Sequence, residues 1–349
     1  MNVSMVQVGI TTRCNSHCHF CFREELKRAG RKEGSVDMPV EVFKKILSNK
    51  DVCDVQLCCN RGEAIFHPQI DIIIDMIKES DCRFEMNTNG DRFDSDWWHN
   101  LGKKMTEGDQ IIFAIDGLKE AHEFYRGTKW MRVINNMKAF INGGGRSIWQ
   151  MIAFEHNERQ IEVLKVLSKK LGCAETWIIN SRKYNEKYRR PTEKFNKTKE
   201  DILRDEEPDG INCRFFHGKR VYIGVDGEVW PCCFTRCHFG FKERAYPHNP
   251  VTNSVKEQRD YINVANTPLN EIVEKSKLFK TVFAHMNDSS VPYIKTHGLK
   301  SSPDEEIMYK NPNEDCLMRH PRLMVNFACQ LYCGNNPKLD TKNRRRVEN

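Results

Sequence analysis

The stretch Cys14-Asn15-Ser16-His17-Cys18-His19-Phe20-Cys21 holds three cysteines in the spacing C-x3-C-x2-C, directly after a strand-like apolar run. Three thiolates can hold a four-iron cluster and leave one iron without a protein ligand, so that this iron is open to a cofactor. A ferredoxin-type carrier normally supplies four cysteines, and a structural zinc site closes with four ligands in paired spacings that this stretch lacks. The stretch therefore indicates a catalytic iron-sulfur site. The simpler alternatives are a zinc knuckle completed by His17 or His19, or ordinary buried thiols.

Length and cysteine content restrict the class of protein. The chain has 349 residues, enough for one large domain or two of ordinary size. We find no run of about 18 apolar residues that would suggest a membrane helix, and residues 1–10 lack the apolar run of a signal peptide. The 15 cysteines, an odd number, fit metal ligation in a reducing compartment better than a disulfide framework. We therefore expect a cytoplasmic protein with no membrane partner.

The formal net charge of +7 arises from lysines and arginines spread over the whole chain, apart from a terminal run at Arg344-Arg345-Arg346. Such a run is more typical of a solvated tail than of a nucleic-acid-binding arm. No nucleic-acid partner is expected.

Short apolar runs alternate with segments of helical period, which is typical of a parallel α/β fold. We predict six strands, over residues 5–10, 53–59, 83–88, 110–116, 148–154 and 176–180. Parallel strands with right-handed crossovers form either a barrel or an open sheet, and the pattern alone does not choose between them. In both, reactive groups gather at the carboxyl ends of the strands, and the cysteine stretch lies at such an end.

Four amphipathic helices are predicted between the strands. Asp37 is expected to cap the first, and Gly143 and Gly172 to end the third and fourth. Residues 183–209 are charged, lose the period and indicate a solvated linker. The expected apolar faces consist of Val40, Phe43, Ile46 and Leu47; Ile70, Ile73, Ile74 and Ile77; Val133, Ile134, Met137, Phe140 and Ile141; and Ile161, Leu164, Val166, Leu167 and Leu171.

The cysteine stretch and the ends of the next three strands resemble the radical S-adenosylmethionine superfamily. The stretch matches that superfamily's cluster loop, including the aromatic Phe20 before the last cysteine. Gly62-Glu63 matches part of its Gly-Gly-Glu motif, and Asn87-Thr88-Asn89-Gly90 is similar to its Thr-Asn-Gly turn. Ala114-Ile115-Asp116-Gly117 and Tyr125-Arg126-Gly127 are similar to its Ser-x-Asp-Gly and Tyr-Arg-Gly motifs.

The resemblance implies a partial (β/α)6 barrel and a specific chemistry. Cys14, Cys18 and Cys21 would be catalytic and would hold a [4Fe-4S] cluster whose open iron chelates S-adenosylmethionine. A reductant such as flavodoxin or ferredoxin would supply an electron, and cleavage would give a 5'-deoxyadenosyl radical that abstracts a substrate hydrogen. The implied cofactor-binding residues are Phe20, Gly62, Glu63, Asn89, Asp116 and Arg126, with Glu63 on the amino group and Arg126 on the carboxylate of the cofactor.

Three positions depart from the superfamily motifs. Arg61, Ala64 and Ala114 stand where glycine, proline and serine are usual. These departures favour the competing hypothesis, a non-catalytic iron-sulfur or zinc protein that transfers electrons.

A second group of cysteines lies in the last third of the chain. Residues 221–232 predict a hairpin with Asp226-Gly227 at its turn. The pattern Cys213-x13-Gly227-x4-Cys232 resembles the opening of the auxiliary-cluster region in SPASM and twitch extensions. The cysteines present are fewer than a full SPASM extension has, which predicts one auxiliary iron-sulfur cluster, with a zinc site as the alternative. The proposed ligands are Cys213, Cys232, Cys316 and Cys333, with Cys329 as a substitute, whereas Cys53, Cys82 and Cys173 are expected to be core thiols.

The predicted domain organisation and function follow from these parts. We expect a radical S-adenosylmethionine barrel over residues 1–182, a charged linker over 183–210, a small SPASM or twitch-like domain over 211–340 and a basic tail over 341–349. The auxiliary cluster would take an electron from the substrate radical or hold the substrate. Modification of a peptide or protein residue ranks above dehydrogenation of a small molecule, and a peptide substrate would need a separate recognition partner.

Overall fold

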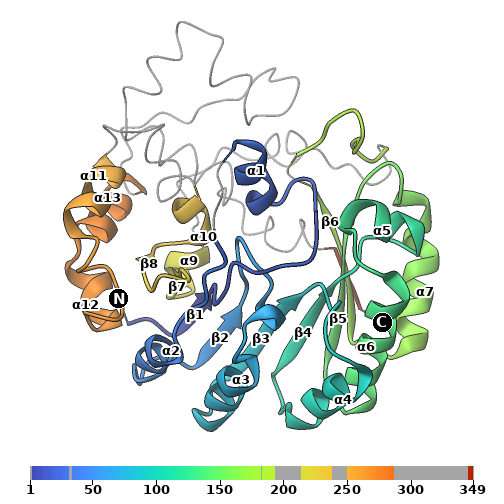
Figure 1. The fold of residues 1–349 in the computed structure, drawn as a ribbon, viewed down its shortest axis with the longest axis horizontal. Helices are drawn as coiled ribbons and strands as arrows, with labels where there is room; N and C mark the ends of the chain where they lie inside the picture. Colours follow the sequence, from blue (N-terminus) through green and yellow to red (C-terminus); the bar gives the residue numbers. More distant parts are fainter. Residues whose placement is uncertain are drawn as a thin grey trace, which may run out of the picture.

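The structure is a computed structural model, and it describes residues 2–30, 34–181, 183–192, 214–237, 250–286 and 345–348. Its centre is a mostly parallel sheet in the order β8-β7-β1-β2-β3-β4-β5-β6-β9 (Figure 1). The strands are β1 (Met5–Val8), β2 (Asp54–Leu57), β3 (Arg83–Thr88), β4 (Gln110–Ala114), β5 (Ser147–Ala153), β6 (Glu175–Asn180), β7 (Arg220–Ile223), β8 (Val229–Trp230) and β9 (Arg345–Glu348). In the described residues the sheet is open, so the partial barrel expected from the sequence is confirmed.

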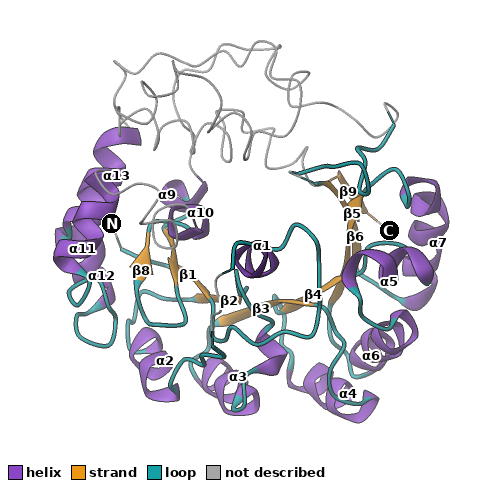
Figure 2. Ribbon diagram, turned by 45° about the horizontal axis from the view of Figure 1, so that its top comes forward, coloured by secondary structure: helices purple, strands orange, loops and turns teal. Residues whose placement is uncertain are grey.

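Helices join successive strands and cover the convex face of the sheet (Figure 2). α1, in contrast, lies on the concave side. The helical elements are α1 (Phe22–Arg28), α2 (Val40–Leu47), η1 (Ala64–Phe66), α3 (Ile70–Glu79), α4 (Ser95–Lys104), α5 (Glu120–Arg126), α6 (Trp130–Asn142), η2 (Glu158–Gln160), α7 (Ile161–Leu171), α9 (Arg214–His217), α10 (Cys233–Thr235), α11 (Pro250–Gln258), α12 (Leu269–Lys275) and α13 (Lys277–Met286). No helix in the described part of the chain is long and apolar enough to cross a membrane.

All six strands predicted from the sequence are present, and so is the hairpin, as the antiparallel pair β7 and β8. β7 pairs in parallel with β1, with Val6 opposite Val221 and Val8 opposite Ile223. The hairpin therefore extends the barrel sheet next to its first strand.

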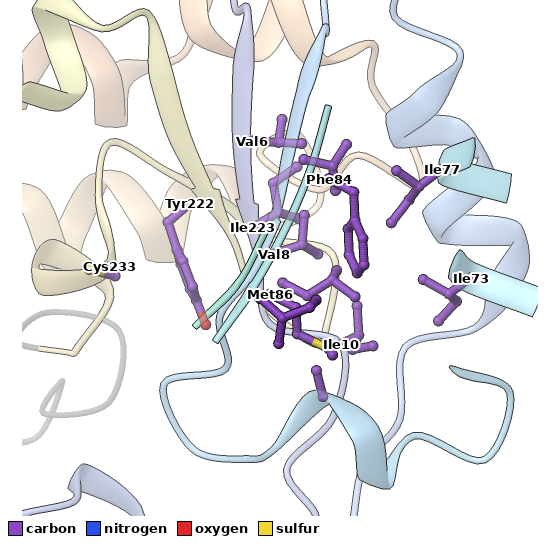
Figure 3. Close-up of a cluster of buried hydrophobic side chains, with 14 of the residues drawn as sticks. Val6, Val8, Ile10, Ile73, Ile77, Phe84, Met86, Tyr222, Ile223 and Cys233 are labelled. Atoms are coloured by element: carbon purple, nitrogen blue, oxygen red, sulfur yellow. The ribbon is translucent and has the colours of Figure 1, made fainter. Parts of the chain in front are cut away.

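The main hydrophobic core lies between the sheet and the convex helices. Val6, Val8 and Phe84 project from the strands toward Ile73 and Ile77 of α3, and all five are fully buried (Figure 3). Because successive side chains of a strand point to opposite faces, the residues between them point toward the concave face. Figure 3 shows Tyr222 of β7 on that opposite side of the strands.

Three expectations about individual residues are wrong. Asp37 does not cap α2, since Pro39 holds the cap position and Asp37 accepts hydrogen bonds from Thr11 Oγ1 (2.6 Å) and Arg13 Nε (2.9 Å). Val166 is 69% exposed, because two residues along a helix correspond to a rotation of about 200° away from buried Leu164. Cys53 is exposed at the start of β2, whereas Cys82 and Cys173 are buried as expected.

Candidate iron-sulfur and cofactor site

The loop with the three cysteines follows β1 and is shaped by side chains of α1. Arg23 reaches back to donate to the carbonyl oxygens of Cys14 (3.1 Å) and Ser16. The Cys21 N–H donates to the Cys18 carbonyl oxygen at 3.0 Å. The basic side chain that follows the last cysteine therefore fixes the curvature of the loop around the thiols.

The three thiols are half-buried and influence one another. The pKa of Cys14 is raised to about 11 and that of Cys18 to about 12. Burial is the main cause, and negative charge on Glu63 (for Cys14) and on Cys21 (for both) contributes to these shifts. Without a metal these two thiols are neutral, so cluster binding must displace their protons. Among the described residues no three Cys, His, Asp or Glu side chains converge on a point where one metal ion would sit. A four-iron cluster takes one thiolate on each iron, so its ligands do not have to converge in that way.

Both histidines of the loop have other contacts. His19 Nε2 lies 2.9 Å from Asn185 Nδ2, and its ring packs against Phe20. His17 Nδ1 lies 3.9 Å from the Glu24 carboxylate. These contacts disfavour the zinc-knuckle alternative.

Asn89, at the end of β3, joins the cysteine loop to Glu63. Its side-chain Nδ2 donates to Asn15 Oδ1 (2.8 Å) and Ser16 Oγ (2.7 Å) and lies 3.9 Å from Cys14 Sγ. Its backbone N–H donates to Glu63 Oε2 at 2.7 Å. The structure thus gives Asn89 a positioning role for the loop, and its contact with the cofactor stays a prediction.

Gly62 and Glu63 lie against the cysteine loop from the end of β2. A Cβ atom on Gly62 would stand 1.9 Å from the Thr11 carbonyl oxygen, so only glycine permits this approach. The Glu63 N–H donates to the Arg13 carbonyl oxygen at 2.8 Å. Burial raises the pKa of Glu63 to about 7, although the Asn89 N–H opposes the shift. Glu63 Oε1 is buried and makes no hydrogen bond within the described residues, so it remains available to a ligand.

Arg126 and Asp116 form a buried ion pair beside Cys18. Arg126 Nε lies 2.6 Å from Asp116 Oδ2, and Asp116 Oδ1 accepts from the Ile152 N–H at 2.6 Å. Arg126 Nη1 lies 3.9 Å from Cys18 Sγ. Burial disfavours the charge of Arg126, but Asp116 and Cys18 more than offset it, so the pKa of Arg126 lies above its ordinary value. Asp116 therefore holds Arg126, and Arg126 faces the cysteine loop.

Phe20 lies in an aromatic cluster on the other side of the loop. Its ring contacts Phe154 (6.2 Å between centroids) and Tyr188 (5.8 Å). Tyr188 is only 4% exposed, and Lys183 forms an ion pair with Glu25 at 2.8 Å. Tyr188 and Lys183 therefore pack on the site, whereas most side chains of residues 185–192 are exposed, and the limits of the predicted linker stay a prediction.

The predicted auxiliary ligands are mostly outside the described residues. This applies to Cys213, Cys316, Cys329 and Cys333. Cys232 is buried at the start of α10, where its Sγ accepts from the Thr235 N–H at 3.4 Å. The ligand set of the auxiliary cluster stays a prediction.

Cys59 and Cys237, to which the sequence assigned no role, lie between the cysteine loop and the hairpin of β7 and β8. Asn60 Nδ2, just after β2, donates to Cys237 Sγ at 3.4 Å. Burial raises the pKa of Cys59 and of Cys237 to about 12, and Cys237 interacts electrostatically with Cys21. The crowding of Cys58 with Cys59 and of Cys232 with Cys233 and Cys237 was the available signal, but only the parallel pairing of β7 with β1 brings the two groups together.

Comparisons with known proteins agree with this geometry. Residues 8–167 match the family model of the radical SAM superfamily, and residues 213–295 match the model of SPASM, an iron-sulfur cluster-binding domain. No curated protein matches the chain. The match to SPASM ends before Cys316, Cys329 and Cys333.

Solved structures share the fold at low sequence identity. SuiB of Streptococcus suis, solved with precursor peptide SuiA, is 14% identical with a TM-score of 0.51, over 80% of this chain and 75% of SuiB. The protein anSMEcpe, solved with AdoMet and the Cp18Cys peptide, is 16% identical with a TM-score of 0.51, over 79% of this chain and 81% of that one. Another anSMEcpe structure, with bound AdoMet, has a TM-score of 0.53.

Proposed function

This chain belongs to the radical S-adenosylmethionine superfamily and carries a SPASM domain, and on that basis we propose that it modifies a residue of a peptide or protein by hydrogen abstraction. The radical SAM domain binds a [4Fe-4S] cluster and S-adenosylmethionine, and the SPASM domain binds auxiliary iron-sulfur clusters. The enzyme would be an oxidoreductase or maturase, and it would need a reductant such as flavodoxin or ferredoxin.

The residues around the cysteine loop fit the cofactor. The observation that carries the proposal is Glu63 Oε1, a buried carboxylate oxygen that has no partner in the described residues and lies beside a loop of three cysteines. A carboxylate in this position suits the amino group of S-adenosylmethionine, because the bond is charge-assisted. When bound, the cluster and S-adenosylmethionine supply a 5'-deoxyadenosyl radical by reductive cleavage.

Each of the chain's own groups has a defined task in this proposal. Cys14, Cys18 and Cys21 hold three irons, and Arg126 pairs with the cofactor carboxylate while Asp116 keeps the guanidinium in place. An ammonium beside Glu63 lowers its pKa from about 7, so binding of the cofactor removes a proton from this carboxyl group. Phe20 and Tyr188 cover the loop with apolar surface and exclude water from it.

The auxiliary region is assigned by chemistry and position. We keep the domain limits 1–182, 183–210, 211–340 and 341–349, and one auxiliary cluster held by Cys213, Cys232, Cys316 and Cys333, with Cys329 as a substitute. Its role would be to take an electron from the substrate radical or to hold the substrate.

A peptide substrate is supported by the relatives of similar fold. SuiB was solved with the precursor peptide SuiA, and anSMEcpe was solved with the Cp18Cys peptide. Both share this fold over most of the chain, which favours the same substrate class here.

The test is cofactor cleavage without substrate. Anaerobic, reconstituted protein reduced with dithionite should release 5'-deoxyadenosine from S-adenosylmethionine. A variant with Cys14, Cys18 and Cys21 all replaced by alanine should release none and should still bind the auxiliary iron. Cys53→Ala, which changes an exposed thiol, is the matched control and should behave as wild type. If the fully reconstituted wild type gave no product, the enzymatic function would be rejected.

A further inference from the structure

A row of polar side chains crosses the concave face of the sheet. Gln7 of β1 lies opposite Gln56 of β2, Gln56 opposite Glu85 of β3, and Glu85 opposite Gln110 of β4. Asn87, two residues after Glu85, has the same orientation. We call these five residues the polar floor: Gln7, Gln56, Glu85, Asn87 and Gln110.

The polar floor points away from the convex helices. Val6 and Val8 flank Gln7, and Phe84 and Met86 flank Glu85, and all four belong to the core that packs on the helices. Tyr222, which is opposite Gln7 in the sheet, lies on the other side of the strands in Figure 3. The amides and the carboxyl group of the floor therefore face the concave side.

The floor is rich in acceptors that lack donors. Gln56 Nε2 donates to Glu85 Oε1 and to Asn87 Oδ1 (3.1 Å), and Gln110 Nε2 donates to Glu85 Oε2 at 2.5 Å. Gln7, Gln56 and Glu85 are only 7%, 4% and 9% exposed. Gln7 Oε1 and Gln56 Oε1 are buried and have no hydrogen-bond partner among the described residues. Buried acceptors of this kind call for a donor from elsewhere.

The floor also holds a carboxyl group whose nearest cation is engaged elsewhere. Among the described residues no Lys, Arg or His lies within ion-pair distance of Glu85, because Arg83, two residues earlier on the same strand, pairs with Asp54 and interacts with Glu85 only at longer range. A buried carboxylate is costly unless a cation or a proton compensates it. A group with several donors and a positive charge would satisfy both the carboxylate and the two amide oxygens.

The position of the floor suits a substrate that reaches the cysteine loop. Asn89, which contacts that loop, directly follows β3 and lies four residues beyond Glu85, which corresponds to about 13 Å of extended chain. One or two residues of an extended peptide with a long basic side chain span this distance.

We propose that the polar floor binds the ammonium or guanidinium group of the substrate, so that the enzyme selects a peptide with a basic residue near the residue it modifies. This inference rests on the proposed function, which supplies the peptide substrate, but its test measures only how tightly the polar floor binds a basic side chain.

The probes are N-acetyl-arginine amide and its uncharged isostere N-acetyl-citrulline amide. Calorimetric titration of the reconstituted protein with S-adenosylmethionine present should show about tenfold or greater preference for the arginine derivative, as a charge-assisted buried bond implies. Glu85→Gln keeps the shape and should abolish the preference, and Glu79→Gln, an exposed change on α3, should retain it. The wild-type comparison of the two probes needs no variant and stands even if Glu85→Gln does not fold.

Three results would overturn the proposal: equal affinity of the two probes, no binding of either because water alone occupies the floor, or an unchanged preference in Glu85→Gln. Release of 5'-deoxyadenosine without substrate is measured on the same wild-type samples. Its absence rejects the radical chemistry and leaves the binding result standing, whereas equal probe affinities reject the floor and leave the chemistry standing.

Discussion

Replacing Asn89 by alanine tests whether this residue positions the cysteine loop. The change removes the donor to Asn15 Oδ1 and Ser16 Oγ, and also the acceptor Oδ1 that receives the Asp91 N–H at 3.0 Å. Three hydrogen bonds with a net value of about 1 kcal/mol each give a loss of about 3 kcal/mol. That loss is smaller than the total stability of an ordinary domain, so the variant should fold.

The loss should be local as well as global. Denaturant unfolding measures the free energy, and amide hydrogen exchange should show faster exchange in residues 14–21 than in wild type, while the strands change little. Asn100→Ala, at an exposed position of α4, is the matched control. If Asn89→Ala stayed within about 0.5 kcal/mol of wild type and its loop exchange were unchanged, the positioning role would be wrong.

Two further predictions concern the residues at the end of β2. Gly62→Ala should lower the free energy of unfolding by about 2–4 kcal/mol and weaken S-adenosylmethionine binding in equilibrium dialysis, because the alanine Cβ would collide with the Thr11 carbonyl oxygen. Gly34→Ala is the control and should have little effect, because a Cβ at that position meets nothing within 4 Å. Glu63→Gln should change the pH dependence of stability of the cofactor-free protein. The pKa of Glu63 is raised from 4.5 to about 7, so the folded wild type holds a proton that the unfolded chain has lost, and its stability falls as pH rises between these values. The variant should gain up to about 3 kcal/mol over wild type across this window, and parallel pH profiles of the two proteins would contradict the assigned burial.

The sequence was sufficient for the parts of the fold that depend on local pattern. Apolar runs gave the strands, and the glycines at 143 and 172 gave helix ends, the latter in a left-handed conformation. α4 was not predicted, because its buried face is formed by Trp98, Leu101 and Gly102 within an otherwise polar segment. Its start is set by Asp94, which accepts from the Trp97 N–H at 3.0 Å.

The site divides in the same way. The motifs identified Glu63, Asn89 and Arg126 as neighbours of the cysteines, and the structure places each in contact with the cysteine loop or with a partner that touches it. The polar floor could not be predicted, because a glutamine between two valines indicates only a strand. The register between strands decides which glutamine lies opposite Glu85, and the pattern within one strand carries no information about this register.

The pairing of β7 with β1 has a consequence for the order in which the protein can fold. β1 comprises the first residues to leave the ribosome that belong to the sheet, yet its second neighbour is made only after residue 220 has been synthesised. Until then one side of β1 carries unpaired backbone groups, which are a template for association with other chains. Contacts this distant in sequence also form slowly. Residues 1–182 expressed alone should therefore have an exposed strand edge, and nascent chains of this protein should depend on protection until the hairpin is added.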